Sequence, residues 1–444
     1  MLSLSDSILY QEGKQSMKKT LCLILALAML LSISSALADP KKIDGISDRG
    51  IVINTAGLNA EPDEMIAQGI SPTTGRNLED ITDVPDGFMG VAVSGIYQPM
   101  MVQISNSMNG IGVNNKGIPY QYAPVNASYA DVVYESVQKQ EGTESRMTML
   151  FSDLIPDYVG FVRSTRLSHV FLRQEWNCAF CTSGYSDADV PEGWRETGVK
   201  SPQTATPDDP GLVYVGDYPK VWKDYVWRLY PLAGPNNEVF MLADIVNNIV
   251  PKDHKAANHT WLFTDEVPEG GDDASIIYVT FGSELETNSR LEYDPETKLY
   301  TRYCKVQKAG DLPYMDSKIV NPVRKKVNNN GQIQERIVYE DRYANEAITF
   351  SNVIVQGINM RWLGGSRPDP ELTGTGNADY FMCGKHYAGV WERKDLNERT
   401  VFYGADGNEI SLQRGKTLII LMPVQEAWNK QKLQPSAKRS VSYE

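Results

Sequence analysis

Histidine, cysteine and net positive charge are all scarce in this chain. Its 444 residues include four His, too few to favour a multi-histidine metal site, and five Cys, far below a disulfide-dense scaffold. Lys and Arg number 43 against 56 Asp and Glu, which gives a formal net charge of −13. Nucleic-acid phosphates bind concentrated positive charge, so this balance argues against a nucleic-acid partner. We expect neither a metal nor another cofactor.

Long apolar runs are absent except near the N-terminus. Met17-Lys18-Lys19 is a positive region, Thr20–Ser35 is apolar and uncharged, and Ala36-Leu37-Ala38 places small residues before a cleavage point. This order is typical of a secretory signal peptide cleaved near Ala38. A transmembrane anchor would need a longer run and a stop-transfer patch. We therefore predict a signal peptide at residues 1–38, with the true start at Met17. The product would be secreted or extracytoplasmic, with no permanent membrane span.

The cysteines do not indicate a lipid anchor. Cys22 lies inside the apolar run, too early for a lipobox cysteine, and the others are Cys178, Cys181, Cys304 and Cys383. Outside the cytosol, four cysteines permit two disulfides in three connectivities. The Cys178–Cys181 pair could serve redox chemistry, zinc binding or structure. Its segment has the pattern of a strand, which puts residues i and i+3 about 10 Å apart, so we favour structural cysteines.

The rest of the chain divides into four parts by composition. Residues 39–70 are acidic and rich in turn formers, as in a flexible leader, and residues 429–444 form a polar tail. Between them we predict an α/β domain at 71–262 and a β-rich domain at 263–428.

The α/β prediction depends on alternating patterns. Short apolar runs predict strands at Met100–Ile104 and Met147–Phe151, and another strand holds Cys178 and Cys181. Helices are predicted at Ala130–Val137, where two valines are spaced i, i+4, and at Val162–Trp176. This alternation predicts a mixed sheet with helices packed on its faces.

The β-rich prediction depends on turns and short strands. Ser275–Phe281 and Thr417–Met422 are predicted strands, and Asp294–Thr297 is the turn of a predicted hairpin. Asp406-Gly407 suits a second hairpin turn, because this pair tolerates positive φ.

Several segments together resemble the YerB-like family of bacterial extracytoplasmic proteins. They are Ser71–Gly75, Pro99–Asn106, Ala130–Glu135, Gly142–Arg146, Gly160–Arg166, Asn352–Gln356 and Gly407–Pro423. The resemblance covers nearly all of residues 71–425 and implies two domains of unknown function in an envelope-associated protein. Many members are lipoproteins, and the family has no established reaction.

The chain departs from the family pattern at three places. Phe161 stands where the family usually has Pro, and Thr165 where it has Ala. The usual His-Ala-Gly-Gly-Ser loop is replaced by the segment Cys181–Ser186, which has no histidine.

An anion site is the sharpest functional hypothesis from the residues. Arg163 and Arg166 are spaced i, i+3 at the expected start of a helix, Ser164 adds a hydroxyl, and Arg146 would add a third cation. Free N–H groups at a helix start and bidentate guanidinium groups suit a carboxylate or phosphate. Asn106, at a strand end, could bind the ligand or stabilise the next turn.

The same residues also suit a structural role. Asp131 and Glu135 are spaced i, i+4 and could pair with these arginines in a buried ionic network. The first functional hypothesis is a binding or accessory factor of the envelope, for an anionic small molecule, a cell-wall fragment or an envelope protein. The alternative is an enzyme acting on cell-wall or other extracellular material with Asp131 or Glu135 as its acid–base group. The third is a structural module for protein interaction.

Overall fold

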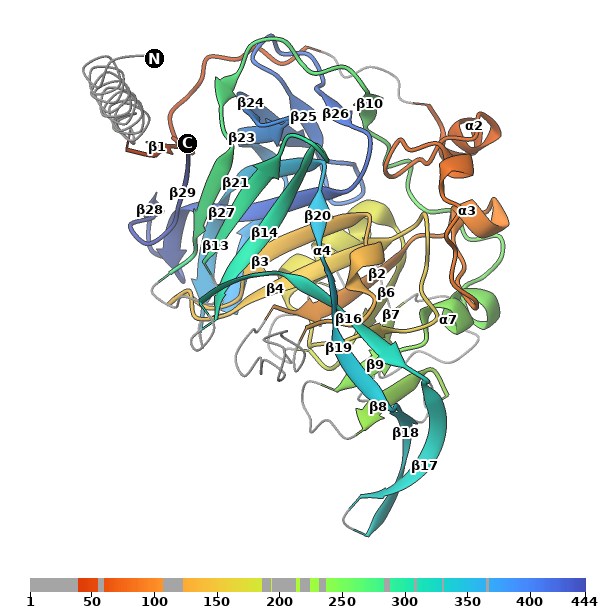
Figure 1. Ribbon diagram of the computed structural model, residues 1–444. Helices are drawn as coiled ribbons and strands as arrows, with labels where there is room; N and C mark the ends of the chain where they lie inside the picture. The colour runs from red at the N-terminus through yellow and green to blue at the C-terminus, as the bar shows by residue number, and fades with distance from the viewer. Residues whose placement is uncertain are drawn as a thin grey trace, which may run out of the picture. The chain divides into compact units, whose positions relative to one another are not determined.

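The apolar and β-branched runs of this chain assemble into a central sheet of 13 strands (Figure 1). The computed structural model describes residues 39–54, 60–106, 123–185, 193, 213–215, 224–230, 237–282, 288–306, 310–329, 331–364 and 367–444. The strand order is β11 (Asp272–Asp273), β24 (Lys385–Arg393), β23 (Gly374–Met382), β21 (Asn352–Leu363), β27 (Thr417–Trp428), β3 (Val132–Val137), β4 (Ser145–Phe151), β2 (Met100–Ser105), β6 (Ala179–Thr182) and β7 (Val213–Val215). Beside this path, β22 (Arg367–Glu371), β25 (Val401–Tyr403) and β28 (Gln434–Pro435) pair with β21, β24 and β27.

Smaller sheets surround the central one. One contains β29 (Ser440–Tyr443), β12 (Ile276–Thr280), β13 (Ser289–Asp294), β14 (Leu299–Val306), β15 (Gly310–Pro313) and β20 (Thr349–Phe350). A five-stranded sheet contains β17 (Val323–Asn329), β18 (Gln332–Val338), β8 (Val226–Tyr230), β9 (Glu238–Phe240) and β5 (Val159–Gly160). The two-stranded pairs are β10 (Leu262–Thr264) with β26 (Ser411–Gln413) and β16 (Met315–Val320) with β19 (Asp341–Ala347).

Helices are short, and they lie around the sheets. They are α2 (Pro62–Ala67), α3 (Val91–Ser94), α4 (Leu167–Trp176) and α7 (Leu242–Asn248), with 3-10 turns η1 (Leu78–Asp80) and η2 (Ala127–Tyr129); a two-residue strand, β1, covers Lys41–Lys42. No helix among the described residues is long and apolar enough to cross a membrane.

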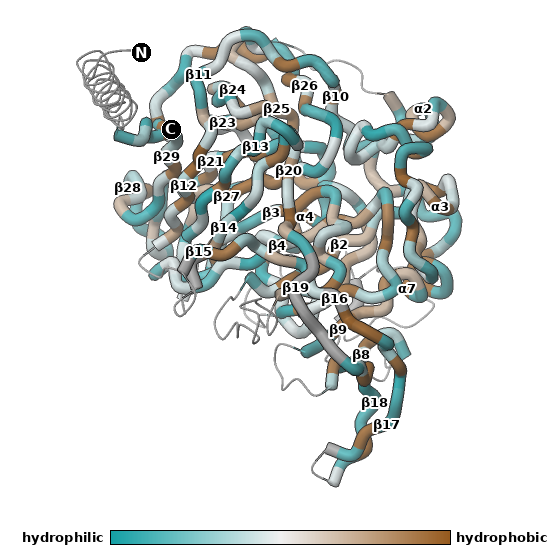
Figure 2. Tube along the Cα trace, viewed as in Figure 1, coloured by the Kyte–Doolittle hydropathy of each residue, from teal (hydrophilic) through white to brown (hydrophobic). Residues whose placement is uncertain are grey.

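The middle of the central sheet joins distant parts of the chain. Strand β27 runs parallel to β3, with Thr417 to Leu421 opposite Val132 to Ser136, and it pairs with β21 on its other edge. The first seven residues of β27 are buried, as expected for a strand covered on both faces. Figure 2 shows these central strands as the most hydrophobic part of the sheet. The domain limits at 71–262 and 263–428 remain a prediction, and strands from both stretches share this sheet.

Each face of β3 has a different cover. On one face, Arg302 of β14 binds Glu135, so the sheet that contains β14 packs there. On the other face, the Trp176 Nε1–H donates to the Tyr134 hydroxyl at 2.9 Å, which places the end of α4 against the strand. Alternate residues of one strand therefore meet a sheet and a helix.

The predicted α/β fold of the N-terminal half is wrong, because strands dominate this region and a second sheet covers one face of the central sheet. The clearest error is Ala130–Val137, predicted as a helix and found as β3. Residues i and i+4 share a face in a strand as well as in a helix, so the valine spacing did not separate the two. The β-branched valines and the partner strands β27 and β4 decided the outcome.

The predicted helix at Val162–Trp176 is right only in its second part. Helix α4 begins at Leu167, and residues before it run in extended conformation along neighbouring strands. The backbone N–H of Arg163 donates to the Gln103 carbonyl at 2.8 Å, an interaction that a helix would not allow.

Both ends of the described chain are bound to sheets. Arg49, in the leader segment, forms an ion pair with Asp379 of β23 at 2.8 Å. Near the C-terminus, β29 pairs antiparallel with β12, and Val441 is buried there. Residues 42–443 form one compact unit.

Candidate functional site

The two segments that carry the predicted arginines, Arg163–Arg166 and the part of β4 with Arg146, meet beside the start of α4. The Arg163 backbone is held on both sides: its N–H binds β2, and its carbonyl accepts the Ser183 N–H at 3.0 Å and the Thr182 hydroxyl at 2.9 Å. The prediction that Arg163 and Arg166 share a helix face is wrong, because α4 begins only after Arg166, which is its N-cap residue.

Arg146 reaches this segment from β4. It is buried, its guanidinium donates to the Ser164 carbonyl, and two of its nitrogens donate to Glu144 Oε1 at 2.7 and 3.1 Å. Ser164 therefore contributes its carbonyl to Arg146. The predicted residues Arg146, Arg163, Ser164 and Arg166 lie together, and we call this group the arginine cluster.

The arginine cluster holds like charges close together. Burial and the positive charges of Arg166 and Arg163 together lower the pKa of Arg146 to about 10, against the opposing effect of Glu144. Burial would raise the pKa of Glu144, but Arg146, Lys139 and Arg166 lower it overall. Among the described residues, no carboxylate forms an ion pair with Arg163.

The sequence analysis missed His169, which belongs to this cluster. His169 is fully buried on α4, and its Nδ1 accepts the Arg166 backbone N–H at 3.0 Å. Burial, Arg146 and Arg166 keep its pKa well below the usual histidine value, so the ring is neutral at pH 7. The available signal was a polar side chain three residues after a helix cap, which can bind back to the cap.

Asn106 and Glu135 lie on the opposite face of the central sheet. Asn106 Nδ2 donates to Glu135 Oε1 at 2.9 Å and to the Ser145 hydroxyl at 2.7 Å. Ser145 and Arg146 are neighbours on β4, so their side chains point to opposite faces. Asn106 is thus separated from the arginine cluster by the sheet.

Glu135 pairs with a residue that the sequence analysis did not consider. Its carboxylate binds Arg302 at 2.7 Å, and both side chains are fully buried. Arg302 also donates to Cys304 Sγ at 2.6 Å. The predicted pairing of Glu135 with the arginine cluster is therefore wrong, although a buried ionic pair does form.

Asp131 belongs to a different site. Its Oδ2 accepts the backbone N–H groups of Ser152 and Asp153 at 2.7 and 2.8 Å. Burial and the neighbouring Asp153 raise its pKa well above the usual aspartate value, and the two N–H groups and Lys416 reduce this effect. Asp131 lines a pocket of about 230 Å³ together with Asp153 and Lys416.

The four predicted structural cysteines are free thiols. Cys178, Cys181 and Cys304 are buried, and burial raises the thiol pKa of Cys178 to about 12 and of Cys304 to about 11. A reactive cysteine has a lowered pKa, so the environment of these three thiols is that of buried structural cysteines.

We predict that three of these thiols react only after unfolding. In a Cys22→Ser variant, Ellman's reagent should label Cys383 in the folded protein, because this side chain alone among the four is partly exposed. Addition of denaturant should then release three more equivalents. Fast labelling of two or more thiols under native conditions would contradict the buried positions.

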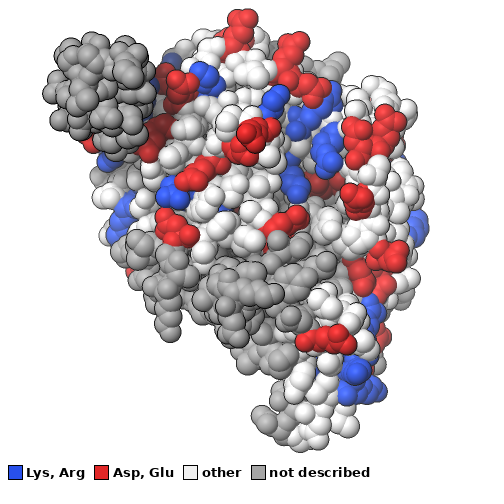
Figure 3. Space-filling view, viewed as in Figure 1, with Lys and Arg blue, Asp and Glu red and all other residues white. Residues whose placement is uncertain are grey.

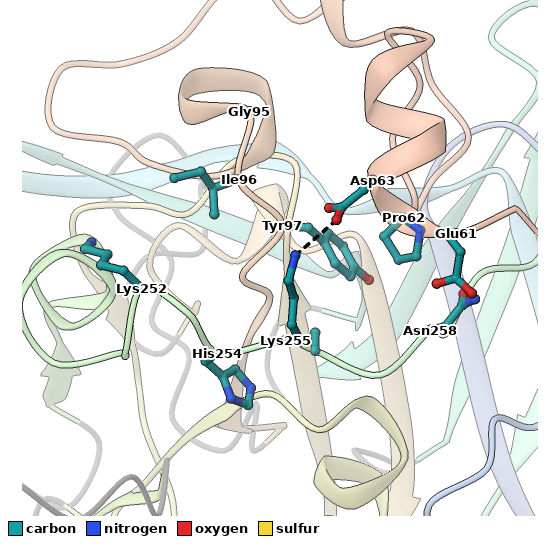
Figure 4. Close-up of a pocket in the computed structure, with 11 residues that line it drawn as sticks. Glu61, Pro62, Asp63, Gly95, Ile96, Tyr97, Lys252, His254, Lys255 and Asn258 are labelled. Atoms are coloured by element: carbon teal, nitrogen blue, oxygen red, sulfur yellow. Dashed lines mark hydrogen bonds and ion pairs between the residues drawn. The ribbon is translucent and has the colours of Figure 1, made fainter.

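A larger pocket, of about 420 Å³, was not predicted from the sequence (Figure 4). Lys255 and Asp63 point toward one another across it and pair at 3.0 Å, and both are largely exposed. The Nε2 atom of His254 forms a hydrogen bond with the Asn177 carbonyl at 2.7 Å. The Tyr97 hydroxyl lies 3.2 Å from Thr73 Oγ1, and burial raises its pKa. Two of the charged side chains of this pocket, Lys255 and Asp63, thus already pair with one another.

No metal centre is found in the described ranges, which contain no group of three His, Cys, Asp or Glu side chains arranged to hold an ion.

Comparison with known domains decides the family. Residues 97–207 match the N-terminal domain and residues 328–419 the C-terminal domain of the proteins of unknown function DUF3048. The chain belongs to the YerB-like family. The resemblance found in the sequence is thus confirmed.

A solved structure shares the fold of this YerB-like protein. The crystal structure of the YerB protein from Bacillus subtilis matches with a TM-score of 0.51 and 18% sequence identity, over 80% of this chain and 96% of that one. No curated protein matches the chain. The N-terminal YerB-like domain holds Asp131 and the arginine cluster. The C-terminal one holds Lys416, which directly precedes β27 and lies near Asp131.

Proposed function

We propose that this YerB-like protein is an extracytoplasmic binding or accessory factor of the bacterial envelope, and that its arginine cluster binds an anionic ligand. The observation that carries the proposal is that buried Arg146 donates to the Ser164 carbonyl, between Arg163 and Arg166 in the chain, and lies within reach of the positive charge of both, with Glu144 as its ion-pair partner. The location follows from the signal-peptide pattern of residues 1–38.

Electrostatics favour an anion at this position. A guanidinium whose affinity for protons is lowered by neighbouring positive charge, as that of Arg146 is, is stabilised when negative charge arrives beside it. Arg163 is partly exposed, and its backbone is already fixed by β2 and the Thr182–Ser183 segment. Its side chain can therefore serve a ligand without being needed for the fold. A planar guanidinium suits a carboxylate or phosphate through two parallel hydrogen bonds.

An enzyme that uses Glu135 is disfavoured by the contacts of this residue. Its carboxylate is fully buried and paired with Arg302, Asn106 and Ser145. A general acid or base must reach substrate, and Glu135 does not line any of the pockets described.

The experiment is a thermal-shift and calorimetric screen with Arg163→Ala as the test variant. The ligands are muropeptides, sugar phosphates and small carboxylates. A ligand at about 100 times its Kd should stabilise the protein by about 2.7 kcal/mol. Arg163→Ala should weaken binding about tenfold without lowering the melting temperature of the free protein.

The matched control is Arg361→Ala, which removes an exposed arginine of β21 paired with Glu371. It should leave anion binding unchanged. Equal binding by wild type and Arg163→Ala, or no anion that shifts the wild type, would overturn the proposal and leave the protein-interaction module as the better hypothesis.

A further inference from the structure

A second polar pocket lies where two of the family-like segments, those that hold Asp131 and Lys416, come together. These two residues and the segments Arg76–Asp83 and Asp153–Leu154 contribute to the wall of a space of about 230 Å³. Its volume is below the usual range for drug-sized ligands, so it suits a small molecule. The arginine cluster does not contribute to it.

Two buried carboxyl groups form the floor of this pocket. Asp153 Oδ1 accepts the Ser71 hydroxyl, and its Oδ2 accepts the Thr74 hydroxyl at 2.6 Å. Asp131 uses Oδ2 for two backbone N–H groups. Asp131 Oδ1 has no hydrogen-bond partner in the described part of the chain, and the residue lines the pocket. A carboxyl oxygen at a pocket wall that accepts no hydrogen bond from the protein can accept one from a ligand.

Two cations stand near these carboxyl groups. Lys416, between β26 and β27, donates to the Ser128 carbonyl. It is close enough to Asp131 and Arg76 for their charges to change its pKa, which Asp131 raises and Arg76 lowers. Arg76 lines the pocket, and its guanidinium has no ion pair with any residue the structure describes. The unpartnered guanidinium and the unpartnered carboxyl oxygen thus share one pocket without binding one another.

The remaining charges of the pocket are negative. Asp80, Asp83 and Glu346 also line it, so five acidic groups face two basic ones. The view in Figure 3 shows Lys and Arg side chains gathered over β20, β25 and β26 with Asp and Glu side chains beside them. A purely anionic ligand would meet this acidic excess, and a purely cationic one would leave Arg76 unpaired.

We infer that this pocket binds a small zwitterion of the amino-acid class, with the ligand's carboxylate at Arg76 and its ammonium group at Asp131 Oδ1. The ammonium would donate to the free carboxyl oxygen, and its charge would compensate the Asp131–Asp153 pair. The carboxylate would accept from the Arg76 guanidinium. The site is independent of the anion site proposed above.

The test is calorimetric titration of the full chain with free amino acids in both L and D configuration, with acetate and ethylammonium as half-molecules. At least one amino acid should bind, and each half-molecule should bind at least tenfold more weakly. Arg76→Ala should weaken amino-acid binding at least tenfold. Asp131→Asn, which keeps the oxygen that accepts the two N–H groups, should do the same.

Arg361→Ala serves as the matched control, because it removes an exposed arginine that belongs to neither site and should leave amino-acid binding unchanged. Arg76→Ala is expected to fold, since no described residue forms an ion pair with it. The inference is overturned if no amino acid binds or if Arg76→Ala binds as wild type does. It is also overturned if acetate or ethylammonium binds wild type as tightly as the complete zwitterion and loses that binding in Arg76→Ala, since such binding belongs to this pocket and not to the arginine cluster.

Discussion

Glu135→Ala should destabilise the protein by about 3–5 kcal/mol, because it leaves the Arg302 guanidinium buried without its counterion. Both side chains of this pair are fully buried, 2.7 Å apart, and Glu135 also accepts hydrogen bonds from Asn106 and Ser145. The substitution therefore also leaves these donors without their acceptor. Urea-induced unfolding at pH 7 measures the loss, which is a large part of a typical folding free energy of about 5–15 kcal/mol.

An exposed ion pair gives the matched comparison. Glu371 of the edge strand β22 pairs with Arg361 of β21, and both side chains are more than a third exposed. Glu371→Ala removes this pair. We expect a loss below about 1 kcal/mol. The double variant Glu135→Leu/Arg302→Met should recover much of the stability, because apolar residues replace both charges. A loss below 1 kcal/mol for Glu135→Ala would show that the pair is not buried as described.

Glu175→Gln should cost about 3 kcal/mol at pH 7, and the cost should shrink in acid. Glu175 of α4 is 2.7 Å from His259, 3.2 Å from Arg393 of β24, and accepts the Thr400 N–H at 2.7 Å. Burial alone would raise its pKa, but Arg393 and His259 outweigh burial and lower the pKa from 4.5 to about 2. This lowering of the Glu175 pKa on folding corresponds to about 3 kcal/mol of folding free energy.

The direction of the pH effect follows from this lowered pKa. The unfolded chain binds the Glu175 proton more readily than the folded protein does, so the stabilisation is complete above about pH 4.5 and is lost as pH falls toward 2. Between pH 5 and pH 3, wild type should lose about 2 kcal/mol more than Glu175→Gln. Denaturant unfolding at several pH values measures the difference.

Glu398→Gln is the control for that experiment, because Glu398 is an exposed glutamate near the same arginine and accepts from Arg393 only through its backbone carbonyl. Its unfolding free energy should follow wild type at every pH. Parallel pH curves for wild type and Glu175→Gln would show that Glu175 is not ionised in the folded protein.

Local sequence patterns predicted single strands well when only one secondary structure suited them. Met100–Ile104 and Met147–Phe151 became β2 and β4, and the turn at Asp294–Thr297 joins β13 to β14. They failed at Ala130–Val137, where the apolar spacing suits a helix and a strand equally. The choice there depended on pairing with β27, which is almost 300 residues away.

The candidate sites also include a part that local sequence predicts and a part that it does not predict. The short segment Arg163–Arg166 was identifiable, because its arginines are neighbours in sequence. The partners of the acidic residues were not identifiable, because Glu135 pairs with Arg302 and Asp131 lies beside Lys416. Such contacts are set by strand order and register, which no local spacing encodes.

The sequence by itself determined the family, the acidic composition, the signal-peptide pattern and the positions of many strands. These properties depend on residue type and on local spacing, which are readable without coordinates. Only the tertiary structure decided that Asn106 and Arg146 lie on opposite faces of one sheet, and that Asp131, Asp153, Arg76 and Lys416 surround one pocket. The physical reason is that strands pair across long chain separations, so the side chains that meet are selected by the completed sheet.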